Sequence, residues 1–442
     1  MKNLMLIYNA RLIDRDTDKK NSAVLIEENK IIGFPTKETV KEFLKNPSKN
    51  TSLYDAKGAV VMPAFIDTHA HFRDPGQTQK EDIISGCKAA ARGGFGTLVL
   101  MPNTSPVISS EKDALLNNKK AKDSCLADVI QSVSITKNFD GQTISHLEKL
   151  NAKNVPVITE DGKEVANASV MLQAMKIAAK KKLIVSCHCE DPILAQEAKP
   201  LRTKALTALK KGNKAEAIKL LQEANKLLAI AEDTLTMRNI RLAEEAGCHL
   251  HLCHVSTERC IQAVLESRAR GNKNLTFEVT PHHLGLSTEK KENLFHIVNP
   301  PLRSESDRKA LIEALIDGTA TCIATDHAPH TSEDKANGAP GFSGSETAFA
   351  TCCTTLVHEN GMSLKKLSSL MSASPANLLG LKNKGLLQEG FIADLTIVDP
   401  DAVWTVHGED FASRGKYTPL EGKKVTGKIL ATIHNGKIVF EA

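Results

Sequence analysis

The sequence lacks three features, each of which would indicate a particular class of protein. Its ten cysteines are scattered without a Cys-x-x-Cys pair, which predicts free thiols in a reducing compartment and hence a cytoplasmic protein. The 57 basic and 52 acidic residues almost balance, so a nucleic-acid groove is not expected. No run of about 18 apolar residues occurs, and charges follow a short apolar start, so we expect neither a membrane span nor a signal peptide.

The composition that is present is typical of a soluble globular protein. Hydrophobic residues make up 41% and charged residues 25% of the 442 residues, as in ordinary globular domains. An (α/β) barrel uses about 250 residues, often more with insertions. The chain is therefore long enough for one barrel and a smaller companion domain.

Short alternating or β-branched runs, bounded by turn-forming residues, predict strands near both ends of the chain. Such strands can pair across the termini, which predicts a small β-sandwich domain built from both ends around an inserted barrel. The expected domains are residues 1–62 and 383–442 for the two parts of the sandwich and 63–382 for the barrel. The end runs are Leu4 to Leu12, Ser22 to Phe34, Ala393 to Pro400 and Lys428 to Phe440.

The middle of the chain alternates apolar runs with helical stretches, as a parallel βα fold requires. Eight such runs occur, and eight parallel strands close a TIM-like (β/α)8 barrel. We therefore predict an α/β fold with this barrel at its centre. The predicted strands are Ala64 to His69, Phe95 to Met101, Asp128 to Ile135, Val155 to Thr159, Leu183 to Cys187, Leu250 to Cys253, Leu275 to Thr280 and Ala320 to Thr325.

Helical periodicity is clearest in three stretches of the predicted barrel. Two of them, Ser169 to Lys182 and Thr257 to Arg270, predict single helices. The third, Ala205 to Ala246, is rich in Ala, Leu, Lys and Glu and predicts an amphipathic helical hairpin packed on the barrel. A lid over the active site is the alternative interpretation of this stretch.

Two histidines stand at the end of the first predicted barrel strand. His69 and His71 are two residues apart, so on an extended chain their imidazoles point the same way and can reach one ion. Four further candidate ligands follow later strands, at the face where barrel enzymes assemble their sites. They are Asp161 after the fourth strand, His188 after the fifth, His254 after the sixth and Asp326 after the eighth. Together these positions predict a metal centre.

Imidazole nitrogens and carboxylate oxygens, with no obligate thiolate, suit zinc, although cobalt or manganese would accept the same ligands. One or two zinc ions are expected, because a carboxylate such as Asp161 can bridge two ions. Bound ions lower the pKa of water toward about 7 and polarise the carbonyl under attack. The ligands would divide into His69, His71 and Asp326 on one ion and His188 and His254 on the other.

Six short motifs lie at or near these strand ends: His69 to Gly76, Met101 to Thr104, His188 to Asp191, His254 to Thr257, Asn299 to Arg303 and Asp326 to His330. In this order they resemble the class I dihydroorotases, metal-dependent cyclic amidases of the amidohydrolase superfamily. The resemblance implies that all six residues named above are metal ligands. Many superfamily members bridge their metals with a carboxylated lysine, whereas Glu160-Asp161-Gly162 is similar to the Asp-Asp-Gly of bacterial class I dihydroorotases.

The resemblance also implies an activity, the reversible cyclisation of N-carbamoyl-L-aspartate to L-dihydroorotate and water in de novo pyrimidine (UMP) biosynthesis. It assigns Arg73, Asn103 and His330 to the free carboxylate of the substrate, and a guanidinium offers the fork that a carboxylate prefers. Asn299 is expected to contact the ring. As a hypothesis, Asp326 takes the proton of a metal-bound hydroxide during attack and delivers it to the departing nitrogen.

Two other functions stay open at this point. Another cyclic amidase, such as a hydantoinase, dihydropyrimidinase or allantoinase, would share the barrel and the histidines, but those families usually carry the bridging lysine and lack the Arg73 pattern. A catalytically inactive homologue could serve as a scaffold subunit, although none of the six ligands is missing. A homo-oligomer is expected, and an association with aspartate carbamoyltransferase is left open.

Several neighbouring residues have two interpretations. His282 and His283 follow the seventh strand and are either hydrogen-bond partners of the metal ligands or packing residues. Cys187 and Cys189 are expected to be buried, but a bend in the backbone would let Cys189 compete as a soft zinc ligand. His327 is expected to orient its loop.

Overall fold

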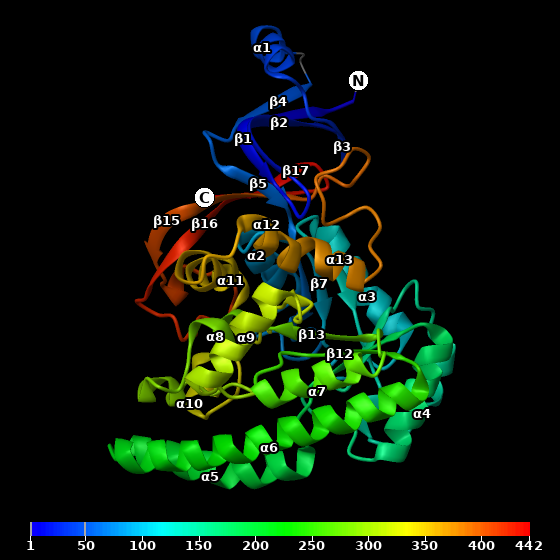
Figure 1. The fold of residues 1–442 in the computed structure, drawn as a ribbon, viewed down its shortest axis with the longest axis vertical. Coiled ribbons are helices and arrows are strands. Elements are labelled where there is room, and N and C mark those ends of the chain that lie inside the picture. The colour runs from blue at the N-terminus through cyan, green and yellow to red at the C-terminus, as the bar shows by residue number, and fades with distance from the viewer. Residues whose placement is uncertain (1, 48–49) are drawn as a thin grey trace.

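The structure is a computed structural model that describes residues 2–47 and 50–442 (Figure 1). Residues 1, 48 and 49, which fall in the first expected domain, lie outside the described residues. The fold is α/β, with parallel strands in the middle of the chain and a mixed sheet made from its two ends. Within the described residues, no helix combines the length and apolar character that crossing a membrane requires.

The parallel strands follow the predicted apolar runs closely. They form a three-stranded sheet, β6-β7-β8, and a six-stranded sheet, β14-β13-β12-β11-β10-β9. The predicted third strand is divided at Ser132, whose N–H donates to Leu100 O at 3.0 Å. A parallel bridge joins Ala70 to His327, between the start of one sheet and the end of the other. The strands are β6 (Phe65–Ala70), β7 (Phe95–Leu100), β8 (Asp128–Gln131), β9 (Val133–Ser134), β10 (Val157–Thr159), β11 (Ile184–Cys187), β12 (His249–Leu252), β13 (Leu275–Val279) and β14 (Cys322–Ile323).

Helices follow most of these strands along the chain. Helix α2 begins with a capping box, in which the Asp82 carboxylate accepts the Ser85 N–H and the Ser85 hydroxyl accepts the Asp82 N–H. The two predicted single helices are confirmed as α4 (Ala168–Lys181) and α7 (Glu258–Ala269). The other helices are α1 (Lys37–Lys45), α2 (Ile83–Arg92), α3 (Glu111–Ser124), α8 (Pro281–Gly285), α9 (Glu305–Asp317), α10 (Ser332–Ala336), α11 (Ala348–Cys352), α12 (Leu364–Ser368) and α13 (Ser374–Leu378).

The predicted helical hairpin is present but longer than expected. It consists of α5 (Pro192–Lys210) and α6 (Lys214–Ala246), which lie side by side at the end of the molecule farthest from α1 (Figure 1). The predicted start at Ala205 was wrong because Asp191 caps an earlier helix start: its carboxylate accepts the Ile193 and Leu194 N–H groups at 3.0 Å each. The hairpin packs on the residues near Leu294 and Ile297 through its alanines and leucines.

Strands from both ends of the chain share one eight-stranded sheet, as the sequence predicted. Its order is β17-β16-β15-β5-β1-β2-β3, and β4 pairs with β1. The link between the two ends is β5, which pairs with β1 in parallel and with β15 in antiparallel orientation. The strands are β1 (Leu4–Ile13), β2 (Asp18–Glu27), β3 (Lys30–Gly33), β4 (Thr51–Asp55), β5 (Val60–Pro63), β15 (Leu395–Thr405), β16 (Lys424–His434) and β17 (Lys437–Glu441).

Candidate metal centre and active site

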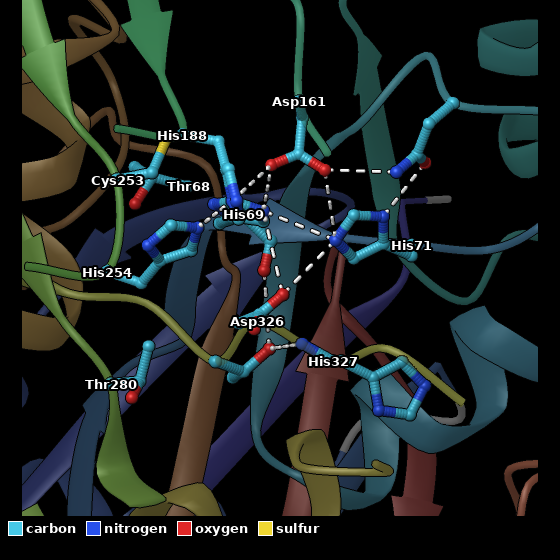
Figure 2. Close-up of polar contacts among 12 residues, drawn as sticks. Thr68, His69, His71, Asp161, His188, Cys253, His254, Thr280, Asp326 and His327 are labelled. Carbon is cyan, nitrogen blue, oxygen red and sulfur yellow. Dashed lines mark hydrogen bonds and ion pairs between the residues drawn. The ribbon is translucent and has the colours of Figure 1, made fainter. Parts of the chain in front are cut away.

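The carboxyl ends of the parallel strands bring six predicted ligands to one place. Parallel strands end at a common edge, so residues that follow different strands meet there. Figure 2 shows the rings of His69 and His71 facing the carboxylates of Asp161 and Asp326, with His188 and His254 beside them. All six side chains are buried.

The distances show how tightly these groups converge. The Nε2 atoms of His69 and His71 are 3.3 Å apart, and His71 Nε2 lies 3.1 Å from Asp326 Oδ1. Asp161 Oδ1 lies 3.4 Å from His69 Nε2 and 3.5 Å from His188 Nδ1. His188 Nδ1 is 2.8 Å from His254 Nε2. Asp161 is therefore central, because it reaches both histidine pairs.

Partners outside this cluster leave the inward ring nitrogens free to bind a cation. His69 Nδ1 lies 3.0 Å from a Glu278 oxygen, and His71 Nδ1 lies 3.0 Å from Asn103 Oδ1. Carboxylate and amide oxygens only accept, so each Nδ1 donates, and in the neutral form of each ring Nε2 presents a lone pair. Asp161 Oδ1 is buried without a hydrogen-bond partner among the described residues. Two lone pairs facing a buried carboxylate oxygen that has no hydrogen-bond partner fit a bound metal ion.

The electrostatics of the cluster agree with a cation site. Burial would raise the pKa of Asp161, but His69, His71 and His188 hold it well below its ordinary value. Burial lowers the pKa of His254 to about 3, and the neighbouring His188 adds to this effect. Although burial alone would lower both, the pKa of His69 is raised by Cys253 and Asp161, and that of His188 is raised to about 9 by Glu190 and Asp161. A bound metal ion would therefore displace protons from this cluster.

Three residues of the site have left-handed backbone conformations that side chains rarely adopt. The φ angles are 55° for Arg73, 33° for His254 and 47° for Asp326. Each such residue costs about 1–3 kcal/mol and persists where the surrounding structure enforces it, most often at functional sites. The backbone is thus bent at three strand ends in order to aim these side chains.

The four predicted substrate contacts line the same pocket of about 230 Å³ as five of the six ligands. The buried Arg73 guanidinium has one nitrogen 3.4 Å from His330 Nε2, and its Nε has no partner among the described residues. His330 Nε2 lies 2.9 Å from Pro340 O. Asn103 Nδ2 donates to Asp161 at 3.0 Å, and Asn299 accepts from Arg202 at 2.6 Å. Arg73 therefore faces the pocket with N–H donors that a ligand could still use.

The structure gives contacts for Cys189, His283 and His327, and it buries Cys187 and His282. The thiol near His69 is that of Cys253, which groups with His69 and Glu278, whereas Cys189 is buried and accepts from Asn239 Nδ2 at 3.7 Å. His283 lies 2.7 Å from Thr280 Oγ1 and 3.2 Å from Pro300 O, so it holds a loop. His327 also holds a loop, because its Nδ1 accepts the Gly344 N–H at 3.1 Å.

One residue of the site, Glu278, was missed from the sequence. It lies in β13 and reaches His69 at 3.0 Å and His251 at 2.9 Å, and it also accepts the Thr68 hydroxyl. A carboxylate that fixes a metal-binding histidine is a common part of metal sites. The signal was available, because Glu278 is a lone charge inside the apolar run Leu275–Val279.

The chain matches the model of the Amidohydrolase family over residues 60–439. It is 41% identical to a dihydroorotase of Clostridium botulinum over 438 residues, covering 99% of both chains. It is 38% identical to a dihydroorotase of Staphylococcus epidermidis, also covering 99% of both. The chain belongs to the dihydroorotases of the amidohydrolase family. Such a protein is a hydrolase with a small-molecule substrate.

Solved structures support the fold of this dihydroorotase family member. The L-hydantoinase (dihydropyrimidinase) of Arthrobacter aurescens matches with a TM-score of 0.85 and 24% identity, covering 100% of this chain and 96% of that one. The dihydropyrimidinase of Brevibacillus agri matches with a TM-score of 0.81 and 21% identity, and the match covers 100% of this chain and 95% of that one.

In this dihydroorotase family member, the neighbouring carboxylates of Glu160 and Asp161 point in different directions. Asp161 faces the histidines, whereas Glu160 turns away and accepts the Thr136 N–H at 2.8 Å. A glutamate in the first position is therefore compatible with the centre, since only the second carboxylate reaches it.

Proposed function

We propose that this hydrolase interconverts N-carbamoyl-L-aspartate and L-dihydroorotate plus water, a step of de novo pyrimidine biosynthesis. The observation that carries the proposal is the buried Arg73 guanidinium beside the histidine and carboxylate cluster, with an Nε that has no partner in the described chain. Both substrates carry a free carboxylate next to a cyclic or ureido amide, and a buried arginine needs such an anion.

We propose zinc as the metal, with one or two ions per chain. His69, His71, Asp161, His188, His254 and Asp326 would hold it, since imidazole and carboxylate groups are zinc ligands. Zinc, when bound, lowers the pKa of water and polarises an amide carbonyl. Asp161 lies near both histidine pairs, so it would be the carboxylate shared by two ions if both were bound.

The remaining roles belong to residues of the chain. Arg73, Asn103 and His330 bind the free carboxylate of the substrate, and Asn299 contacts the ring. In hydrolysis, the oxygen of water bonds to the ring carbonyl carbon and the ring C–N bond breaks. Asp326 takes a proton from the attacking water at a carboxylate oxygen and delivers it to the departing nitrogen. Cyclisation runs through the same proton transfers in reverse.

A spectrophotometric assay with L-dihydroorotate, hydantoin, dihydrouracil and allantoin, each with and without a chelator, tests this function. We expect turnover of dihydroorotate that is lost with the chelator and restored by zinc. Preferential turnover of hydantoin or dihydrouracil would instead favour another cyclic amidase. Absence of turnover on every substrate, in protein that retains zinc, would favour an inactive scaffold subunit.

We also propose the finer architecture. The two parallel sheets form a closed (β/α)8 barrel over residues 63–382, a closure supported by the Ala70–His327 bridge and by the His71 N–H, which donates to His327 O at 2.8 Å. The mixed sheet folds over one apolar core that includes Ile7, Val24 and Ile397, which supports a sandwich formed by residues 1–62 and 383–442.

The assembly and location of the protein are part of the proposal. We propose a cytoplasmic homo-oligomer, with an association with aspartate carbamoyltransferase as a second assembly to be tested. Its ten cysteines are free thiols, which supports a reducing compartment. Light scattering of the purified protein, alone and mixed with the transcarbamoylase, gives the masses that decide both points.

A further inference from the structure

Two loops form one wall of the substrate pocket. Val298 and Asn299 belong to the first loop, and Pro340 and Gly341 belong to the second. A backbone hydrogen bond joins the loops, because the Gly341 N–H donates to Ile297 O at 3.0 Å. We call residues 297–299 and 339–341 together the pocket wall.

Lys335 of α10 ties the two loops of the pocket wall together. Its ammonium group donates to Ala339 O and Gly341 O at 2.7 Å each and to Ile297 O at 3.1 Å. An ammonium has three hydrogens, so all three hydrogen bonds that this side chain can donate go to the pocket wall. It also lies 4.7 Å from the centre of the Tyr417 ring, a cation–π contact that holds it in place.

Arg202 of the helical hairpin holds the first loop from the other side. Its guanidinium donates to Asn299 Oδ1 at 2.6 Å and to Val298 O at 3.2 Å. Burial, followed by the proximity of Arg202, lowers the pKa of Lys335 to about 7. The three bonds to carbonyl oxygens belong to its protonated form, because a neutral amine has only two hydrogens. Neither cation lies within ion-pair distance of a carboxylate in the part of the chain that the structure describes, although the charge of Glu190 acts on Arg202 and opposes the lowering of its pKa by burial.

We propose that Arg202 and Lys335 are positioning residues that hold the pocket wall and thereby set the affinity for the substrate. This inference rests on the proposed function, because the wall touches the residues to which that function assigns the substrate carboxylate. Pro340 O lies 2.9 Å from His330, which in turn lies 3.4 Å from Arg73. A displaced wall therefore moves the carboxylate site, while the histidine cluster keeps its own contacts. The hairpin then acts as a fixed support and not as a lid.

The test compares Arg202→Met and Lys335→Met with Lys204→Met, an exposed lysine on the same helix as Arg202. Because each cation makes charge-assisted hydrogen bonds to the wall, we expect KM for dihydroorotate to rise about tenfold in the first two variants with little change in kcat. Lys204→Met should match the wild type. Arg202→Lys keeps the charge but loses the fork, so it should fall between the wild type and Arg202→Met.

Amide hydrogen exchange of the Gly341 N–H supplies a readout that does not depend on turnover. It should become faster in Arg202→Met and Lys335→Met and stay unchanged in Lys204→Met. Unchanged exchange and unchanged KM in both cation variants would overturn the inference, as would a fall in kcat at constant KM. If the wild type turns over neither dihydroorotate nor N-carbamoyl-L-aspartate, the proposed function fails, and the exchange rates alone still decide whether the two cations hold the wall. If Met variants fail to fold, Arg202→Lys carries both measurements.

Discussion

At the residue scale, Asp326 combines two properties that proton transfer requires. It lies 3.1 Å from His71 Nε2, within the ligand cluster, and it lines the substrate pocket. Replacing it by asparagine keeps the shape but removes the proton acceptor, so kcat should fall by about 10²–10⁴-fold. The measurement is kcat for dihydroorotate together with the zinc content of the variant. Near-normal turnover at full zinc content would contradict the assigned role.

Glu278 should matter for metal binding and not for the substrate. It accepts hydrogen bonds from His69 and His251 at 3.0 and 2.9 Å, and a glutamine side chain in its place would lack the charge that orients the His69 ring. We expect Glu278→Gln to weaken zinc affinity by about 10–100-fold, as is usual for the partners of metal-binding histidines. Competition with a chromophoric chelator measures the affinity. Glu245→Gln, on the exposed face of α6, is the control. Equal zinc affinities in the two variants would rule this role out.

At the element scale, the predicted strands agreed well with the structure because two signals coincide there. The strands are apolar runs, and several of them are followed within a few residues by a polar site residue, as β10 is by Asp161 and β14 by Asp326. The hairpin start was misplaced because the stretch rich in Ala, Leu, Lys and Glu begins at Ala205, whereas the first helix begins at Pro192 and continues through Pro200. The contacts of Lys335 could not be predicted, since they go to backbone carbonyls, which every residue possesses.

Helix α6 is joined to the Asn299 to Arg303 motif by a buried ion pair. Arg303 donates to Glu232 at 2.8 Å, and both side chains are about 5% exposed or less. Removing one partner leaves the other charge buried without compensation, so Glu232→Ala should lower the free energy of unfolding by about 3 kcal/mol or more. Urea denaturation measures the change. Arg241→Ala removes an exposed pair on the same helix and should cost less than about 1 kcal/mol. Equal losses in the two variants would contradict this account.

At the scale of the whole molecule, one lysine joins the mixed sheet to the parallel strands. Lys384 Nζ lies 2.6 Å from Asp128 of β8 and 2.6 Å from Asp394, next to β15. Asp128, Asp394 and His434 form a group that could hold a metal ion, but the ammonium already occupies the space between the two carboxylates. Sequence patterns indicated that both ends of the chain share a sheet, yet the ion pair that attaches this sheet joins positions 256 residues apart and has no local signal.

The stabilisation provided by the ion pair between Lys384 and Asp394 should decrease at low pH. Burial would raise the pKa of Asp394, but His434 and Lys384 lower it to about 2, against about 3.9 in an unfolded chain. Its contribution to stability is therefore complete above about pH 4 and is lost as the pH falls through about 2. Lys384→Met removes the cation that helps to lower the pKa of Asp394, so the variant should have a lower free energy of unfolding than the wild type. This difference should be constant from about pH 5 to 7 and shrink below about pH 4, where Asp394 becomes protonated. Thermal unfolding across this pH range, with the exposed Lys382→Met as control, measures it. A difference that stays the same at pH 3 and pH 7 would show that the Lys384 cation does not set the pKa of Asp394.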